Sequence, residues 1–266
     1  MSDWIWALII GFVLDLLLGD PSWLYHPVCL IGKYIGWMEK KLRRRGGNLR
    51  KSAVFLTAST VLLTMAFVAL ILMLCGLLGR IPLLIAMALL DWMGIAITSM
   101  AKEARGVEKA LGQGVAAGRT QVARIVGRDT QELREEEIIK ATVETVSENT
   151  TDGVISPLLY AAIGGPILLW GFKAASTLDS MVGYLDEKYR DIGWSSAKLD
   201  DVLNYIPARL TALLMVIASY LIGLDGKNAF RIVRRDHANH KSPNCAWSES
   251  AAAGALHIQL GGTHNY

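Results

Sequence analysis

Long apolar stretches alternate with charged blocks along this chain. Residues 52–79 contain no Asp, Glu, Lys, Arg or His. At about 1.5 Å of rise per residue, a helix of this length exceeds the roughly 30 Å hydrocarbon core of a bilayer, so we expect it to span a membrane. The shorter stretch 4–18 predicts a first membrane helix, and 82–100 predicts a third after a tight turn. The pattern predicts an all-α, polytopic integral membrane protein.

The later apolar stretches are less regular. Residues 153–172 are uncharged but contain Gly164, Gly165 and Pro166, which interrupt helical hydrogen bonding. This segment either spans the bilayer or re-enters it from one side, and charge counts do not choose between the two. A further apolar stretch covers residues 210–224.

The charged blocks indicate orientation and place the chemistry. Residues 33–51 hold eight Lys or Arg against one acid, which by the positive-inside rule makes this block cytoplasmic. The mixed charge of 101–152 predicts amphipathic cytoplasmic helices between the spans. We expect a single membrane-embedded domain over 1–266, with the functional site carried by 101–152, 173–204 and 225–250.

Composition excludes several classes of protein. Hydrophobic residues make up 52% and charged residues 19% of the chain, which excludes a disordered tail. With 27 Lys or Arg against 24 Asp or Glu, the chain lacks the basic footprint of a nucleic-acid binder, and we expect no nucleic-acid partner. The widely spaced Cys29, Cys75 and Cys245 predict reduced packing residues.

The first candidate site lies where the 101–152 block meets the following apolar stretch. On an α-helix Glu144, Glu148 and Asp152 would share one face at i, i+4 and i+8. Like charges at this spacing repel, so Mg²⁺ or a cationic substrate group would offset the cost. The alternative is a solvated acidic end of a helix.

The second candidate site lies in the 173–204 block. On a helix Asp179, Asp186 and Arg190 would lie nearly on one line, with Gly183 between them allowing close approach. This would form a cleft with both signs of charge. The alternative is a surface helix in which Asp186 pairs with Arg190.

A third set, Asp15, Asp20 and His26, lies at the end of the first helix. An ionisable residue inside an apolar stretch, such as Asp15, is a functional hypothesis by default. The alternative is an interfacial Asp that reaches water. His237 and His240 share a helical face and could bind a metal, but no third ligand is spaced to help them.

Five stretches resemble the CobD/CbiB family, the membrane-bound adenosylcobinamide-phosphate synthases of cobalamin biosynthesis, and they follow the family's order. They are DLLLGDPSWLYHPVCLIG from Asp15, ETVSENTTDGVISPLLYAAIGG from Glu144, STLDSMVGYLDEKYRDIGW from Ser176, KLDDVLNYIPARLTALL from Lys198 and RRDHANHKSPNCAWSESAAAGALHIQLGG from Arg234. Family members usually continue beyond the GGTHNY ending with a last membrane helix, so we expect this chain to lack that segment.

The resemblance implies an amide ligation. The carboxylate of adenosylcobyric acid would be joined to the amine of (R)-1-amino-2-propanol or its O-phosphate, with ATP and Mg²⁺ as expected cofactors. The implied partners are this corrinoid, the aminopropanol or its phosphate, the lipid bilayer of the inner cell membrane and other membrane proteins of cobalamin assembly. Two alternatives are a non-enzymatic membrane sensor of the AmpE type and a transporter, which would place its acids near the bilayer midplane.

With the resemblance, the candidate residues receive expected roles. The expected catalytic residues are Glu144, Glu148, Asp152, Asp179 and Asp186, and the first three of these are also the expected Mg²⁺ ligands. The expected substrate-binding residues are Asp15, Asp20, His26, Asn149, Arg190, Arg209 and Asn244.

Overall fold

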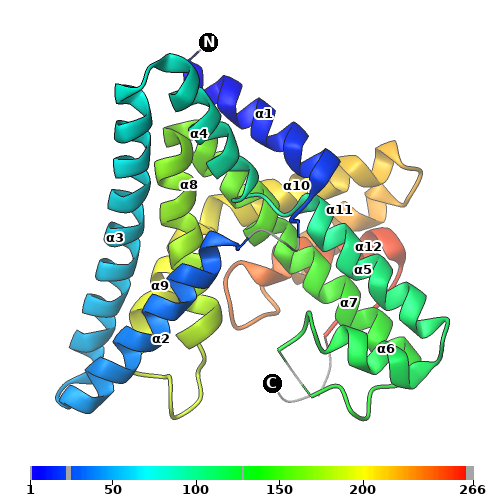
Figure 1. Ribbon diagram of the computed structural model, residues 1–266. Coiled ribbons are helices and arrows are strands. Elements are labelled where there is room, and N and C mark those ends of the chain that lie inside the picture. The colour runs from blue at the N-terminus through cyan, green and yellow to red at the C-terminus, as the bar shows by residue number, and fades with distance from the viewer. Residues whose placement is uncertain (1, 22–24, 128, 262–266) are drawn as a thin grey trace. The chain divides into compact units, whose positions relative to one another are not determined.

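The computed structural model describes residues 2–21, 25–127 and 129–261, and every regular element in these ranges is a helix (Figure 1). The predicted all-α fold is confirmed. The helices are α1 (Asp3–Leu18), α2 (Pro27–Arg45), α3 (Leu49–Leu77), α4 (Arg80–Trp92), α5 (Ile97–Leu111), α6 (Val115–Val122), α7 (Glu135–Thr150), the π-helix η1 (Thr151–Ile155), α8 (Ser156–Val182), α9 (Trp194–Leu203), α10 (Tyr205–Leu221), α11 (Gly226–Asp236) and α12 (Cys245–Leu256).

Three helical stretches of the described chain are long and apolar enough to cross a membrane. They cover Leu49–Leu77, Arg80–Leu111 and Glu135–Val182, and α9 with α10 adds a fourth if this bent pair is counted as one span. Large apolar side chains of α3 are exposed, among them Leu62 and Phe67. A helix with apolar residues all round needs apolar surroundings, which a bilayer provides.

The predicted membrane helix over residues 82–100 lies within the candidate span Arg80–Leu111, but it is not continuous, because α4 ends at Trp92 and α5 begins only at Ile97. A Cβ atom at Gly94, in the intervening turn, would overlap the side chain of Leu169. The indole of Trp92 donates a hydrogen bond to the carbonyl of Gly19 over 3.0 Å. Trp92 and Gly94 thus make tertiary contacts at the point where α4 ends. Hydropathy alone does not reveal this helix end.

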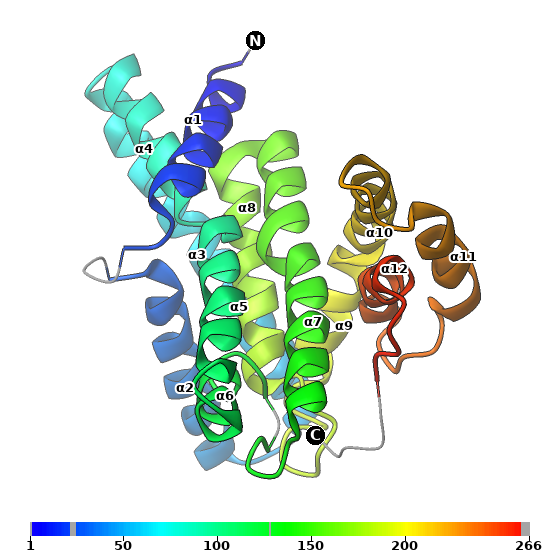
Figure 2. The same ribbon diagram turned by 90° about the vertical axis from the view of Figure 1, so that its right-hand side faces the viewer.

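The chain folds into two compact units, each built from two separate parts of the sequence. Unit 1 comprises Met1–Ala96 with Ser156–Asn204, and unit 2 comprises Ile97–Ile155 with Tyr205–Tyr266. In unit 1, α1 packs along α4, and the long α3 packs along α8 (Figure 1). In unit 2, α12 packs against α7, α10 and α11 (Figure 2). The single membrane-embedded domain stays a prediction.

The core of unit 1 lies among α2, α3 and α8, where Ile35, Leu56, Leu169 and Leu178 are fully buried. Trp170 fills the same core and donates its indole N–H to the carbonyl of Leu90 over 3.0 Å. Because a buried indole needs a hydrogen-bond partner, this contact fixes α8 against α4.

α8 is broken in its middle, as the sequence predicts. Gly164 and Gly165 have non-helical backbone angles, and Gly165 adopts a φ of 64°, which side chains other than glycine rarely tolerate. Pro166 follows and has no N–H to donate to the preceding turn. Whether residues 153–172 span or re-enter a membrane stays a prediction.

The close approach of α1 and α4 depends on Gly11. A Cβ atom there would lie 2.8 Å from the Cβ of Asp91 and from the backbone nitrogen of Trp92. We expect Gly11→Ala to lower the free energy of unfolding by about 1–3 kcal/mol, because the helices would have to separate. Thermal unfolding in detergent measures this change.

Gly36→Ala is the matched control, because Gly36 lies in α2 and a Cβ there would meet nothing within 4 Å. This variant should be as stable as the parent or up to about 1 kcal/mol more stable, as helix propensity favours Ala. Equal melting temperatures for the two variants would contradict the proposed packing role of Gly11.

Candidate functional site

Carboxylates from two helices of unit 2 meet where α7 packs against α12. α7 presents Glu144 and Glu148 one turn apart, and α12 presents Cys245 and Glu249 one turn apart. The Cys245 thiol donates to Oε1 of Glu148 over 3.0 Å, and the backbone N–H of Gly261 donates to Oε1 of Glu144 over 2.6 Å. We call Glu144, Glu148, Glu249 and Cys245 the acid cluster.

The electrostatics of the acid cluster suit proton transfer. Burial raises the pKa of Glu249 to about 7, and the charges of Glu148 and Glu144 contribute to the increase. Burial also raises the pKa of the Cys245 thiol, with a further contribution from the Glu148 carboxylate, so the thiol keeps its proton. An acid whose pKa lies near neutrality can both accept and release a proton, as general acid–base catalysis requires.

Asp152 was predicted to continue the face formed by Glu144 and Glu148 on one regular α-helix, and the helix is not regular at this point. α7 ends at Thr150, and the next five residues form the π-helix η1, whose wider turn changes the helical periodicity. Asp152 nevertheless lies near the cluster, since its charge contributes to the raised pKa of Cys245. Asn149, a predicted substrate-binding residue of α7, is exposed.

The second predicted set does not share a helix face. α8 ends at Val182, where the backbone N–H of Gly183 donates to the carbonyl of Asp179 over 2.7 Å. Asp186 and Arg190 therefore lie in the exposed segment after the helix, where Oδ1 of Asp186 accepts a hydrogen bond from a backbone N–H. The prediction fails because a glycine ends the helix at this position. All of these residues belong to unit 1.

The third predicted set also lies in unit 1. Asp15 is fully buried on α1, so the alternative in which it reaches water is wrong, whereas Asp20 is exposed. His26 caps α2 by accepting the N–H of Val28 over 3.2 Å. Burial lowers the pKa of His26, the charge of Lys173 adds to this effect and Asp20 opposes it. The substrate-binding roles of these residues stay predictions.

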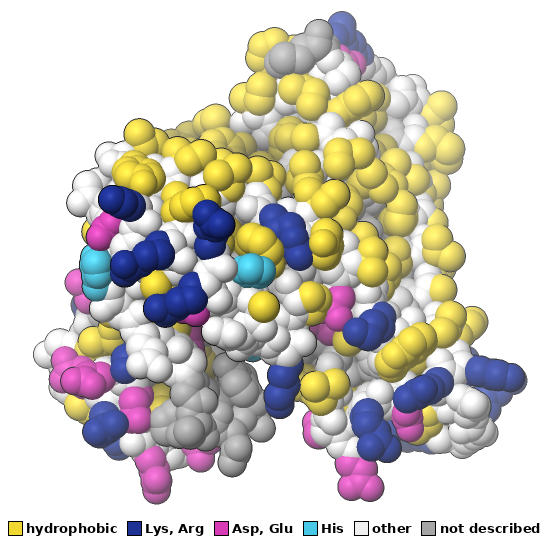
Figure 3. Space-filling view, turned by 180° about the vertical axis from the view of Figure 1, so that it is seen from behind, with side chains coloured by type: hydrophobic (Ala, Val, Ile, Leu, Met, Phe, Trp, Pro, Cys, Tyr) yellow, Lys and Arg dark blue, Asp and Glu magenta, His cyan; other side chains and the backbone are white. Residues whose placement is uncertain are grey.

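A pocket of about 380 Å³ with a basic lining opens in unit 2. The guanidinium of Arg209 lies 3.5 Å from the ring centroid of Tyr205 and 4.6 Å from that of Trp247. On the face seen in Figure 3, Lys, Arg and His side chains lie close together. We call this pocket the basic pocket; its lining residues are Arg209, His237, Ala238, His240, Lys241, Ser242, Pro243 and Trp247.

The basic pocket and the acid cluster share a wall. The Ser242 hydroxyl lines the pocket and is hydrogen-bonded to the sulfur of Cys245, which in turn contacts Glu148. Asn244, a predicted substrate-binding residue, is buried just before α12, and its backbone N–H donates to Oγ of Ser242 over 3.2 Å. Ser242 and Cys245 thus connect the wall of the pocket to Glu148.

The histidines of the pocket are engaged in other contacts. Nδ1 of His237 lies 2.9 Å from the carbonyl oxygen of Val233, and Nδ1 of His240 accepts the N–H of Ser242 over 3.0 Å. Within the described ranges, no group of three His, Cys, Asp or Glu side chains is arranged to hold a metal ion. Neither the hypothesis of a metal site built on His237 and His240 nor the prediction that Glu144, Glu148 and Asp152 together hold Mg²⁺ gains support from this arrangement.

Mg²⁺ and ATP stay expected cofactors, and the acid cluster and the basic pocket contain the types of donor that each of them binds. Mg²⁺ usually binds through one or two carboxylates together with substrate phosphates, so it needs no complete protein cage. Glu148 and Glu144 supply carboxylates, and their negative charges repel the charged form of Glu249. The basic pocket supplies the cations that phosphate oxygens require.

Sequence reasoning missed Glu249, Lys241 and Trp247. One signal could have found Glu249, because it is the only Asp, Glu, Lys or Arg between residue 242 and residue 266. A lone carboxylate among Ala and Ser in a helix is costly to bury. Nothing in the spacing could have shown that it meets Glu144 and Glu148, which are about a hundred residues away in the chain.

Fold and site together define an all-helical protein with candidate membrane helices and, in unit 2, an acid cluster beside a basic pocket. The profile of the family described as CobD/Cbib protein matches residues 8–266. The chain belongs to the CobD/CbiB family. No solved structure matches it significantly.

Its relatives are similar over nearly the whole chain. Cobalamin biosynthesis protein CobD of Pelobacter propionicus is 50% identical over 261 residues, which cover 98% of this chain and 81% of the relative. CobD of Listeria monocytogenes serovar 1/2a is 50% identical over 96% of this chain and 82% of its own. Cobalamin biosynthesis protein CbiB of Salmonella typhi is 44% identical over 98% of this chain and 83% of its own.

The raised pKa of Glu249 predicts a pH-dependent stability. Because its pKa in the folded protein, about 7, lies above the ordinary value of 4.5, the stabilisation is complete below about pH 4.5 and lost as the pH rises through about 7. The loss is about 3 kcal/mol. Glu249→Gln mimics the neutral acid, so it should be more stable than the parent at pH 8 and equal to it at pH 4.5.

Melting temperatures in metal-free buffer across this pH range measure the difference. Glu132→Gln removes an exposed acid of the same unit and should show no such pH-dependent gain. The explanation would be contradicted if Glu249→Gln showed no gain in melting temperature at pH 8. It would also be contradicted if Glu132→Gln showed an equally large gain.

Proposed function

We propose that this protein acts in cobalamin biosynthesis as a multi-pass membrane enzyme that joins an amine to a corrinoid carboxylate. The substrates would be adenosylcobyric acid and aminopropanol or its phosphate. The names of its relatives support the pathway, and the three candidate spans support the membrane location. The observation that carries the catalytic assignment is the acid cluster, in which Glu249 titrates near neutrality beside two further carboxylates.

The reaction balances as carboxylic acid plus amine plus ATP giving amide plus ADP and phosphate. ATP with Mg²⁺ would supply the phosphoryl group that makes the carboxylate a better acyl donor. The chain must then provide an amine without its proton, because only a neutral amine carries the lone pair that attacks the acyl carbon. The C–N bond forms, the bond from the acyl carbon to its activated oxygen breaks, and the amine proton leaves.

The acid cluster divides these tasks by environment. Glu249, with its pKa near 7, would accept the proton of the amine. Glu148, held by the Cys245 thiol, and Glu144, held by the backbone of Gly261, would hold Mg²⁺ together with phosphate oxygens. Asp152 would lie at the margin of this set. No step is assigned to Asp179, Asp186 or Arg190.

The proposal predicts that stability and turnover separate in variants of the cluster. Glu148→Gln and Glu249→Gln should each lower formation of the cobinamide product by about 100-fold or more, since a positioned acid or base contributes at least that factor. Both variants should melt no lower than the parent at pH 8, because each removes a repelling charge. The assay uses membranes supplied with adenosylcobyric acid, aminopropanol phosphate and Mg-ATP.

Glu132→Gln is again the matched control and should keep full turnover. Parental turnover in both cluster variants would reject the catalytic assignment. Loss of turnover together with loss of folding would show instead that the acids serve to dock α7 on α12.

A further inference from the structure

We infer that the basic pocket of unit 2 binds the phosphate group of a small phosphomonoester. The site follows from the structure, whereas the identity of the ligand as the phosphorylated amine rests on the proposed function. Three observations carry the inference: the charge of the pocket, the fixed position of its arginine and the wall that it shares with the acid cluster.

The two cations that line the pocket, Arg209 and Lys241, form no ion pair within the described part of the chain. Nearby Arg235 differs, because two of its guanidinium nitrogens, Nε and Nη2, donate to the carboxylate of Asp236 over 2.8 and 2.7 Å. Two cations beside one cavity repel each other unless an anion joins them, and phosphate is the anion that such donors bind best.

Arg209 is held in place before any ligand arrives. Its guanidinium stacks on the rings of Tyr205 and Trp247, and one nitrogen donates to the carbonyl of Tyr205. A guanidinium has five N–H donors in a fixed fork, so the remaining donors are available for phosphate oxygens. The order already imposed on Arg209 reduces the entropy that binding would otherwise cost.

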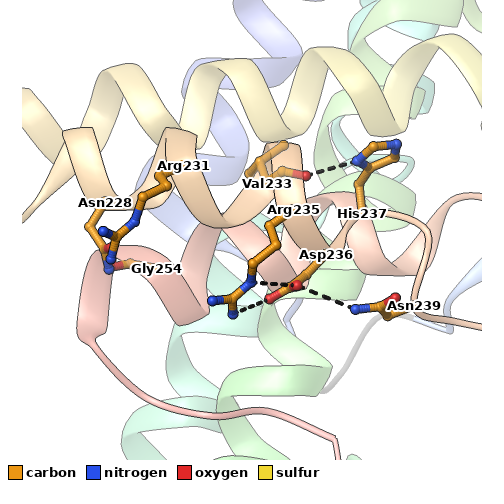
Figure 4. A network of polar contacts seen from close by, with 8 residues as sticks. All are labelled: Asn228, Arg231, Val233, Arg235, Asp236, His237, Asn239 and Gly254. Carbon is orange, nitrogen blue, oxygen red and sulfur yellow. Dashed lines mark hydrogen bonds and ion pairs between the residues drawn. The ribbon is translucent and has the colours of Figure 1, made fainter.

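The segment 236–240, which contributes His237, Ala238 and His240 to the pocket lining, is held by contacts of its own (Figure 4). Oδ1 of Asp236 accepts the amide of Asn239 over 3.3 Å as well as bonding to Arg235. The ring of His237 contacts the carbonyl oxygen of Val233 and lies 4.3 Å from the ring of Trp247. These contacts fix the histidine and the tryptophan as walls of the cavity.

The position of the pocket selects a ligand with two functional ends. Ser242 belongs to the pocket and bonds to Cys245 of the acid cluster. A phosphomonoester whose phosphate lies against Arg209 can therefore direct its other end toward the carboxylates. An amine at that end would meet groups of opposite charge. An amine without a phosphate would lack the contact with Arg209 that holds the ligand in the pocket.

Binding to the purified protein in detergent tests the inference without turnover. Calorimetric titrations would use aminopropanol phosphate, aminopropanol, inorganic phosphate and ATP as separate probes. We expect aminopropanol phosphate to bind at least ten-fold more tightly than aminopropanol. Arg209→Gln and Lys241→Gln should each weaken binding of aminopropanol phosphate by at least ten-fold, and Arg209→Lys should restore part of the loss.

Arg234→Gln and Lys227→Gln are the matched controls, because both side chains are exposed on α11 and neither lines the pocket. They should leave every affinity unchanged. Lys241 is exposed, so Lys241→Gln should fold normally and keeps the test valid if Arg209→Gln unfolds.

The probes separate the possible sources of the phosphate. If inorganic phosphate or ATP binds and the binding depends on Arg209 and Lys241, the pocket is a phosphate site. The probe that binds then identifies the source of the phosphate. The inference is overturned if no phosphate-bearing probe binds or if the two variants leave binding unchanged. Binding without amide formation would refute the proposed reaction alone, whereas turnover without phosphate binding at this pocket would refute the pocket alone.

Discussion

The packing of α12 on α7 forces carboxylates together, and the other features of unit 2 can be understood as responses to this constraint. Glu144, Glu148 and Glu249 would repel one another if all were charged and buried. The structure offsets the repulsion in two ways. A thiol and a backbone N–H each donate to one of the carboxylates, and burial with repulsion raises the pKa of Glu249 to about 7, so that this acid is only partly charged at neutral pH.

Small residues allow α12 to pack closely against α11 on a second side. A Cβ atom at Gly254 would lie 2.6 Å from the Cα of Ala229 and 2.9 Å from the carbonyl oxygen of Asn228, so α11 and α12 approach at backbone distance. The amide of Asn228 donates to the carbonyl of Gly254 over 2.7 Å, and its oxygen accepts a nitrogen of Arg231. α12 is therefore fixed from its outer side by α11 while it presents Glu249 toward α7.

The sequence was informative where local hydropathy decides the structure and misleading where tertiary contacts do. The uncharged residues 52–79 correspond closely to α3, because so long an apolar stretch favours a single helix. By contrast, the face expected from Glu144 to Asp152 ends at a π-helix, and the helix expected from Asp179 to Arg190 ends at Gly183. Pattern rules assume regular helices and do not predict where they end.

Contacts between distant segments were invisible for a different reason. The acid cluster joins Glu148 to Cys245, and the basic pocket joins Arg209 to Trp247, but spacing carries information only along one element. Arg209 was expected from the resemblance to bind substrate, whereas the stacking that positions it was not expected. Only the packing of unit 2 shows that the acid cluster and the basic pocket are neighbours.

Accessibility decides which acids can take part in chemistry. Asp15 and Asp91 of unit 1 are completely buried, and in the described chain neither carboxylate oxygen of Asp91 has a hydrogen-bond partner. A buried carboxylate without a partner, such as that of Asp91, costs stability. Glu148 and Glu249 are only partly buried, and Glu148 is connected through Cys245 to Ser242 of the basic pocket. Reactive carboxylates must be both perturbed and reachable, and in this chain those two conditions meet in unit 2.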